Sequence, residues 1–258
     1  MVDDGSTDNT INICKGYGSK IKYVYKENGG IGSALNRGLL NMSGSWFKWL
    51  SSDDVLYSHA VEELMKAADY SQKKIAYSDY VRINENGEKI DLHHEPKLDH
   101  DEFCATIWLA GRWFIGNGSS ILIHKSCFDR VGLFDEKLRF QEDFDWWLRA
   151  SLIHGYSFLH VPKILLKYRI HHSQLTAEVS HESMVNSELI RQRIKKYLLI
   201  SNPERWKTFS RNLRYYNRYH GVAHGIRMIS RHIIMMLPNK VRRSILRWWI
   251  MSKNLIQR

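Results

Sequence analysis

A short apolar run followed by two adjacent acids places the strongest constraint on what this chain can fold into. The run covers residues 46–50, and Ser51-Ser52-Asp53-Asp54 follows it directly. An aromatic-rich segment of this length that ends in small and acidic residues predicts a buried strand opening into a loop. In open α/β sheets, ligands bind outside the carboxyl ends of the strands. We therefore expect an α/β protein in which the two acids lie where a ligand could bind.

The acid pair has two interpretations. Like charges placed side by side disfavour joint ionisation, and a divalent cation that prefers hard oxygen ligands, Mg²⁺ or Mn²⁺, would remove that cost. The alternative is a surface turn, or a cap for the helix predicted to begin near residues 58–60. Taken alone, Asp53 and Asp54 favour the turn or cap, so the neighbouring motifs have to decide.

Length and composition describe an ordinary globular protein. The chain has 258 residues, 43% hydrophobic and 25% charged, enough for one large α/β domain and an appendage. Cys14, Cys104 and Cys127 are scattered, and His93-His94 lacks spaced partners, so neither a disulfide framework nor a metal site is predicted from them. No secretory signal is found, and no apolar run approaches the roughly 20 residues that span a bilayer. We expect a cytoplasmic protein.

The net charge of +11 is concentrated at the C-terminal end. Residues 203–258 carry 13 Lys and Arg and the single acid Glu204, whereas residues 1–202 carry 25 bases and 26 acids. This shift predicts a domain over 1–202 and a basic tail over 203–258. The tail alternates basic with large apolar residues, including Trp248 and Trp249, as amphipathic helices at an anionic membrane surface do. Packing on the preceding domain and binding to nucleic acid are the alternatives.

Two loops near the N-terminus carry further candidate residues. The Asp-Asp-Gly-Ser turn at residues 3–6 is typical of a strand-to-helix loop. Only Val2 precedes it as a strand residue, so the chain is expected to begin inside a βα unit. The second loop, residues 28–32, follows a predicted strand over 21–25 and opens a helix. Its glycines allow a phosphate or sugar to approach the backbone, although most such loops only form turns.

A third acidic segment begins a predicted helix. Glu142 and Asp143 fall in its first turn, ahead of the apolar residues Trp147 and Leu148. The exposed N–H groups and the dipole at a helix N-terminus favour the ionised carboxylate. Such a carboxylate is suited to act as a general base near neutral pH. Helix capping is again the alternative.

Together these motifs resemble glycosyltransferase family 2, which has the GT-A fold. The motifs occur in order at residues 2–8, 27–30 with 36–39, 53–54, 132–135 with 142–143 and 147–149, and 168–171 (Tyr-Arg-Ile-His). The resemblance covers roughly residues 2–176. It implies a mixed, mostly parallel sheet flanked by helices. The family begins with a strand and a helix ahead of the Asp-Asp-Gly-Ser turn, so the resemblance implies an N-terminally truncated fold with unpaired strand edges.

The resemblance implies an inverting transferase that moves a sugar from a nucleotide-diphosphate donor, a UDP-sugar first of all, to a hydroxyl acceptor. Asp4 would read the base and Asp53 would lie near the ribose. The acceptor would be a saccharide or a lipid-linked molecule, in the synthesis of a cell-surface polysaccharide or glycolipid. The positions assigned to the nucleotide sugar are Asp4, Asn28, Gly30, Gly32 and Asp53.

The resemblance also assigns the metal and the catalytic acids. Asp54 with His171 would hold Mn²⁺ or Mg²⁺ on the diphosphate, where a divalent ion neutralises the charge of the leaving group. Asp143 would deprotonate the acceptor hydroxyl, with Glu142 beside it in the acceptor site. The family often has a further aspartate where this chain has Ser51, so the metal site would have fewer carboxylates.

We expect Asp4, Asp54 and Asp143 to meet around one pocket. Membrane-proximal and lipid-linked acceptors are common for enzymes of this family, which favours an anionic membrane over nucleic acid as the partner of the tail. The protein would then lie peripherally at the inner face of the cell membrane. The alternative function is a truncated, non-catalytic relic that still binds a nucleotide or a membrane.

Overall fold

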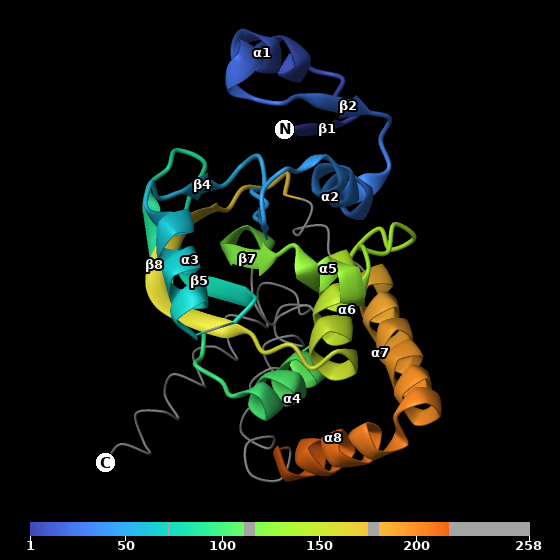
Figure 1. The fold of residues 1–258 in the computed structure, drawn as a ribbon. Coiled ribbons are helices and arrows are strands. Elements are labelled where there is room, and N and C mark those ends of the chain that lie inside the picture. Colours follow the sequence, from blue (N-terminus) through green and yellow to red (C-terminus); the bar gives the residue numbers. More distant parts are fainter. Residues whose placement is uncertain (72, 111–116, 175–180, 217–258) are drawn as a thin grey trace, which may run out of the picture. The chain divides into compact units, whose positions relative to one another are not determined.

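The computed structural model describes residues 1–71, 73–110, 117–174 and 181–216 (Figure 1). The chain divides into two compact units, Met1–Trp206 and Lys207–Arg258. The boundary expected from the charge pattern falls shortly before this division. Most of the basic tail lies outside the described residues, so its helices and its membrane partner stay predictions.

The first strands form a small sheet of their own. Strand β1 (Val2–Asp4) pairs in parallel with β2 (Val24–Lys26), and helix α1 (Thr10–Gly16) and the 3₁₀ turn η1 (Gly18–Lys20) connect them. Within the described residues this sheet has two strands and does not continue into the larger sheet. The predicted strand over 21–25 is thus present but begins later, because Ile21–Tyr23 forms the exit from η1.

Six strands form the larger sheet, in the order β3-β7-β5-β8-β4 with β6 paired to β5. Four of its five strand pairs are antiparallel, and only β5 with β8 is parallel. A mixed sheet is confirmed, but the expectation of a mostly parallel sheet is wrong for this part of the chain. Part of the reason is the tight turn at 84–87, which joins β5 to β6, since antiparallel neighbours need only a short connection. The strands are β3 (Trp46–Phe47), β4 (Val55–Leu56), β5 (Ile75–Ile83), β6 (Lys89–His93), β7 (Ile121–His124) and β8 (Leu159–Arg169).

Helices flank this sheet, as Figure 1 shows. Helix α3 packs on β5, β7 and β8 because its small and apolar residues recur every four positions, at Ala60, Leu64 and Ala68, all buried against Ala76 and Leu122. The remaining helices of the described chain are α2 (Gly30–Asn41), α4 (His100–Ala110), α5 (Ser126–Val131), α6 (Glu142–Leu148), α7 (His181–Ser201) and α8 (Pro203–Tyr216), and α3 spans Ala60–Ser71.

Helix α6 is the centre of a second, aromatic core. Trp146 and Trp147 are fully buried, and α6 continues directly into a π-helical turn, η4 (Arg149–Ile153). Helices α2, α4 and α7 contact α6, and α7 runs alongside it in Figure 1. A helix of only seven residues depends on such packing for its stability. None of the helices in the described ranges is long and apolar enough to cross a membrane.

Candidate functional site

Asp4 lies at the carboxyl end of β1 and caps the first turn of α2. Its Oδ1 atom is 2.5 Å from Nζ of Lys26 and 3.0 Å from the amide nitrogen of Gly29, and its Oδ2 accepts from the amide of Gly30 at 2.9 Å. The free N–H groups at a helix start make this a favourable place for a carboxylate. A carboxylate has about four acceptor positions, and three are used here. Asp4 therefore holds the glycine loop in place, and its carboxylate can still accept one further hydrogen bond.

The loop itself requires glycine at two points. Gly5 has φ of +83°, and a β carbon there would lie 2.7 Å from the amide nitrogen of Asn28. Gly30 has φ of +84°, in the left-handed region that favours glycine. The turn after β1 and the loop before α2 therefore touch at the backbone, which brings Asp4, Asn28 and Gly30 together.

Helix α2 connects this loop to the predicted catalytic acids. A β carbon at Gly32 would lie 3.5 Å from Cβ of Glu142 and 3.4 Å from the carbonyl oxygen of Asp135. One turn later, the buried Asn36 side chain donates to and accepts from the backbone of Phe134, at 3.0 and 2.9 Å. The start of α2 thus packs directly on the start of α6. Sequence reasoning assigned no role to Asn36, and its only signal was its place in the ordered motif.

Glu142 and Asp143 occupy the first turn of α6 in different environments. Glu142 is buried, and burial, together with the charge of Asp143, raises its pKa to about 8. Glu142 is therefore protonated near neutral pH and can donate a hydrogen bond instead of adding a second charge. Asp143 is half-buried, and its Oδ1 accepts from the amide of Phe144 at 2.6 Å. Pairs of acids whose environments separate their protonation states are typical of acid–base sites.

Asp54 is held inside the protein. Its Oδ1 accepts from the amide of Arg169 at 3.1 Å and its Oδ2 from the side-chain amide of Asn117 at 3.3 Å. Burial raises the pKa of Asp54 above its usual value. The side chain of Arg169 bonds in turn to the carbonyl oxygen of Asp53 at 2.9 Å. Asp54 thus fixes the end of β8 against the loop after β3.

His171 pairs with Asp53 instead of Asp54. Its Nε2 atom lies 3.1 Å from Oδ2 of Asp53, whose side chain is partly exposed. This differs from the expected pairing of His171 with Asp54, because the Asp54 carboxylate turns inward to the buried donors of Arg169 and Asn117. Across the described residues, no group of three or more His, Cys, Asp or Glu side chains could hold a metal. Magnesium, however, is commonly held by one or two carboxylates together with substrate phosphates. Asp53 supplies one carboxylate of that kind, with the His171 imidazole beside it.

The loop that carries the two acids is anchored by residues that the sequence did not single out. Lys48 is half-buried, and its Nζ donates to the carbonyl oxygens of Ser119 and Trp49. Burial lowers the pKa of Lys48 to about 7, against the opposing effect of Asp54. The amide of Ser51 donates to Oγ of Ser119 at 3.0 Å, so Ser51, where the family often has an aspartate, holds the loop to the segment before β7.

Trp49 links this loop to α6. Its ring stacks on that of Trp147, with 6.0 Å between centroids and 6° between planes, and it meets Phe134 edge-on at 5.7 Å. The indole also fills the position that a β carbon of Gly118 would take. The predicted residues thus form two groups that both contact α6. Asp4 and the glycine loop are connected to it by α2. The loop at Asp53 is connected to it by the stacking of Trp49 on Trp147.

Two hollows among the described residues do not include the expected pocket of Asp4, Asp54 and Asp143. A hollow of about 400 Å³ lies among α6, η4 and α7, and one of about 280 Å³ lies on α7, and neither is lined by these three acids. The shared pocket stays a prediction.

Comparison with known proteins identifies the family. Residues 1–132 match the sequence profile of glycosyl transferase family 2. The chain belongs to this family. An uncharacterized glycosyltransferase of Rickettsia prowazekii is 37% identical over 184 residues, which cover 68% of this chain and 55% of the relative. Chondroitin synthase of Pasteurella multocida is 27% identical over 216 residues, covering 76% of this chain and 20% of the synthase. This member of family 2 therefore spans about half the length of the Rickettsia relative.

Solved structures support the fold. Crystal structures of residues 1–349 of TarS from S. aureus, in complex with UDP-GlcNAc and with UDP, superpose with TM-scores of 0.63 and 0.60. Each covers 93% of this chain, and this chain covers 66% and 65% of them, at 16% and 15% sequence identity. At this identity the similarity shows a shared fold. The α/β architecture with a mixed, helix-flanked sheet is thus shared with TarS.

Proposed function

We propose that this chain transfers a sugar from a nucleotide-diphosphate donor, a UDP-sugar first of all, to a hydroxyl acceptor with inversion at the anomeric carbon. Family membership and the UDP and UDP-GlcNAc bound by TarS support the donor class. The observation that carries the proposal is the contact between Gly32 and Glu142. It places the loop capped by Asp4 next to the first turn of α6.

In this proposal the acids at the start of α6 act on the acceptor. The carboxylate of Asp143 takes the proton of the acceptor hydroxyl, and the hydroxyl oxygen attacks the anomeric carbon from the face opposite the diphosphate. The bond between that carbon and the diphosphate oxygen breaks, and the nucleoside diphosphate leaves with the electron pair. Glu142, protonated by burial, donates a hydrogen bond to the acceptor or to Asp143.

The donor would be held between the two groups of residues. The remaining acceptor capacity of Asp4 suits the N–H of a base, and the N–H groups of the glycine loop suit a sugar or phosphate. Asp53 and His171 would hold Mn²⁺ or Mg²⁺, with Asp54 behind them fixing the loop. When bound, the ion would supply positive charge to the leaving diphosphate.

The acceptor and the place of action are further parts of the proposal. We propose a saccharide or lipid-linked acceptor at the inner face of the cell membrane, reached through the basic tail, in the synthesis of a surface polysaccharide or glycolipid. The 13 basic residues of 203–258 support an anionic membrane partner. Replacing Arg242, Arg243 and Arg247 with Gln in the full chain should abolish co-sedimentation with phosphatidylserine vesicles. Unchanged sedimentation would contradict the membrane role.

One experiment separates an enzyme from a relic that only binds the nucleotide. Binding of UDP and of UDP-sugars is measured by isothermal titration with MnCl₂ present, and UDP release is measured with a panel of saccharide acceptors. The enzyme predicts release that Asp143→Asn abolishes without weakening UDP binding. Binding without release, equal in both proteins, would favour the relic, and absence of binding would overturn both.

A further inference from the structure

The chain enters α6 through a residue in an unusual backbone conformation. Gln141 has φ of +70° and ψ of +24°, and of the residues that the structure describes it is the only non-glycine with positive φ. Such a conformation is uncommon for residues with a side chain and is held by its surroundings. Gln141 is also buried, and its Nε2 atom has no hydrogen-bond partner within the described chain. The turn that carries Glu142 and Asp143 therefore starts from a strained residue.

Helix α7 holds this residue and the far side of the same turn. The hydroxyl of Ser187 donates to Oε1 of Gln141 at 2.7 Å. Two turns further along α7, Nη1 of Arg193 lies 2.7 Å from Oδ2 of Asp135, and its Nη2 donates to Oδ1 of Asp145. Asp145 is fully buried. One helix thus contacts the residue before the two acids and the residue shortly after them.

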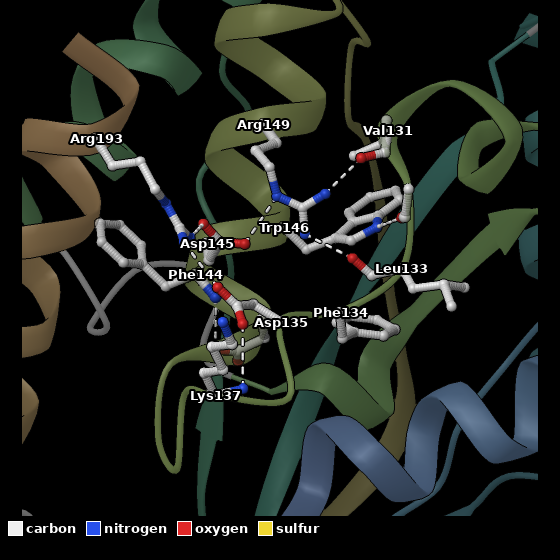
Figure 2. Close-up of polar contacts among 12 residues, drawn as sticks. Val131, Leu133, Phe134, Asp135, Lys137, Phe144, Asp145, Trp146, Arg149 and Arg193 are labelled. Atoms are coloured by element: carbon white, nitrogen blue, oxygen red, sulfur yellow. Dashed lines mark hydrogen bonds and ion pairs between the residues drawn. The ribbon is translucent and has the colours of Figure 1, made fainter. Parts of the chain in front are cut away.

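The buried Asp145 has a second guanidinium on its other oxygen. Nε of Arg149 donates to Oδ2 of Asp145 at 2.8 Å, and its Nη atoms donate to the carbonyl oxygens of Val131 and Leu133. Figure 2 shows Arg193 and Arg149 reaching Asp145 from different elements. Removing one partner of a buried charged group leaves the other uncompensated, which is costly. Asp145 therefore fixes α6 to α7 and to the segment 131–135.

The same segment contacts α2 on its other side. Asn36 bonds to the backbone of Phe134, and the carbonyl oxygen of Asp135 lies against Gly32. Arg193 of α7 is thus connected to the glycine loop through contacts with Asp135 and α2. These contacts do not involve the side chains of Glu142 or Asp143.

We propose that α7 is a brace in which Ser187 and Arg193 act as positioning residues, holding the Glu142-Asp143 turn against the first turn of α2. The expected effect of α7 on kcat rests on the proposed function. Its expected effect on the conformation of the Glu142-Asp143 turn does not. The buried apolar stripe Ile190, Ile194 and Leu198 docks α7, so the polar contacts are not needed to keep it in place.

The brace is tested with three variants of the full chain. Arg193→Gln removes the charge, Arg193→Lys keeps the charge but loses the forked geometry, and Lys196→Gln removes a charge from an exposed position on the same helix. Hydrogen–deuterium exchange is followed by mass spectrometry in peptides covering 141–148. Donor KM and kcat are measured by UDP release.

Arg193→Gln should raise exchange in these peptides at least tenfold and lower kcat at least tenfold, with donor KM changed less than threefold. Arg193→Lys should lie between, and Lys196→Gln should match the wild type. If Arg193→Gln does not fold, Arg193→Lys and Ser187→Ala carry the comparison. Exchange in both Arg193 variants equal to that of Lys196→Gln would overturn the brace. If the wild type releases no UDP with any donor, the proposed function fails while exchange still decides the brace.

Discussion

The repulsion between adjacent carboxylates is relieved in different ways at two places in this chain. Asp53 and Asp54 are separated by partners: Asp54 turns inward to buried donors, and Asp53 pairs with His171. Glu142 and Asp143 are separated by solvation, since burial raises the pKa of Glu142 to about 8. The comparison teaches that neighbouring carboxylates need not act as one unit. We propose that in each pair the buried member has a supporting role and the more exposed member contacts the ligand.

Substituting each of the two acids at the start of α6 in turn should give the largest difference in kcat. Asp143→Asn removes the proposed base, and general-base catalysis typically contributes about 10²- to 10⁴-fold. Glu142→Gln replaces a group that is already neutral near pH 7, so kcat should fall less than about tenfold on the same scale. Steady-state UDP release measures both. Equal losses in the two variants would contradict the separation of roles.

Substitutions of Asp53 and of Asp54 should differ in how much they lower the free energy of unfolding. Asp54→Ala leaves the buried side-chain amide of Asn117 and the half-buried amide of Arg169 without their acceptor, at a cost of about 1–3 kcal/mol for a fully buried unsatisfied group. Asp53→Ala removes a partly exposed pairing with His171, which contributes about 0–1 kcal/mol. Urea unfolding at pH 7 gives both free energies. Asp54→Asn, which keeps the shape and an acceptor oxygen, is the matched control and should lose less than Asp54→Ala.

Glu142 should also make stability depend on pH. Its pKa is raised from 4.5 when unfolded to about 8 when folded, so the folded state binds the extra proton between these values. Stability from this group is fully present below pH 4.5 and is lost as pH rises to about 8, at no more than about 1.4 kcal/mol per pH unit. Glu142→Gln should flatten this part of the profile in urea titrations from pH 5 to 9. An unchanged slope would show that Glu142 is ionised in the folded protein.

The smallest effect is expected at His171. His171→Asn leaves Asp53 as a single protein ligand, so the Mn²⁺ concentration for half-maximal UDP release should rise about tenfold, within the range seen when supporting metal contacts are removed. Asp54→Asn should leave this concentration within about twofold on the same scale, because its oxygens serve the protein. The reverse order would restore Asp54 as the ligand.

The sequence predicts what depends on local order along the chain. The hairpin at 84–87 is of this kind, because Asn84 and Gly87 are typical of a tight turn and Gly87 has φ of +85°. The family followed from the order of motifs and is confirmed by the profile match. The start of α2 lies beside Glu142, but the expected pocket shared by Asp4, Asp54 and Asp143 stays a prediction.

Features that depend on distant partners could not be predicted. His94 is exposed, and no local signal shows that its Nδ1 lies 2.8 Å from the buried Asp79, on a strand that precedes it by one hairpin. Nothing in the sequence shows that Gln141 adopts a left-handed conformation, because this residue type has no preference for it. Likewise, Arg193 is one of many basic residues on an exposed helix face, and only the fold brings it to Asp145.

The contact between Trp49 and Gly118 has a consequence for the history of the family. The indole occupies the space beside the Gly118 backbone where any other amino acid would place its first side-chain atom. A descendant that acquires alanine at 118 has room for it only after the tryptophan has been replaced by something smaller. Positions 49 and 118 are therefore expected to co-vary among related sequences, with glycine at 118 wherever tryptophan is at 49.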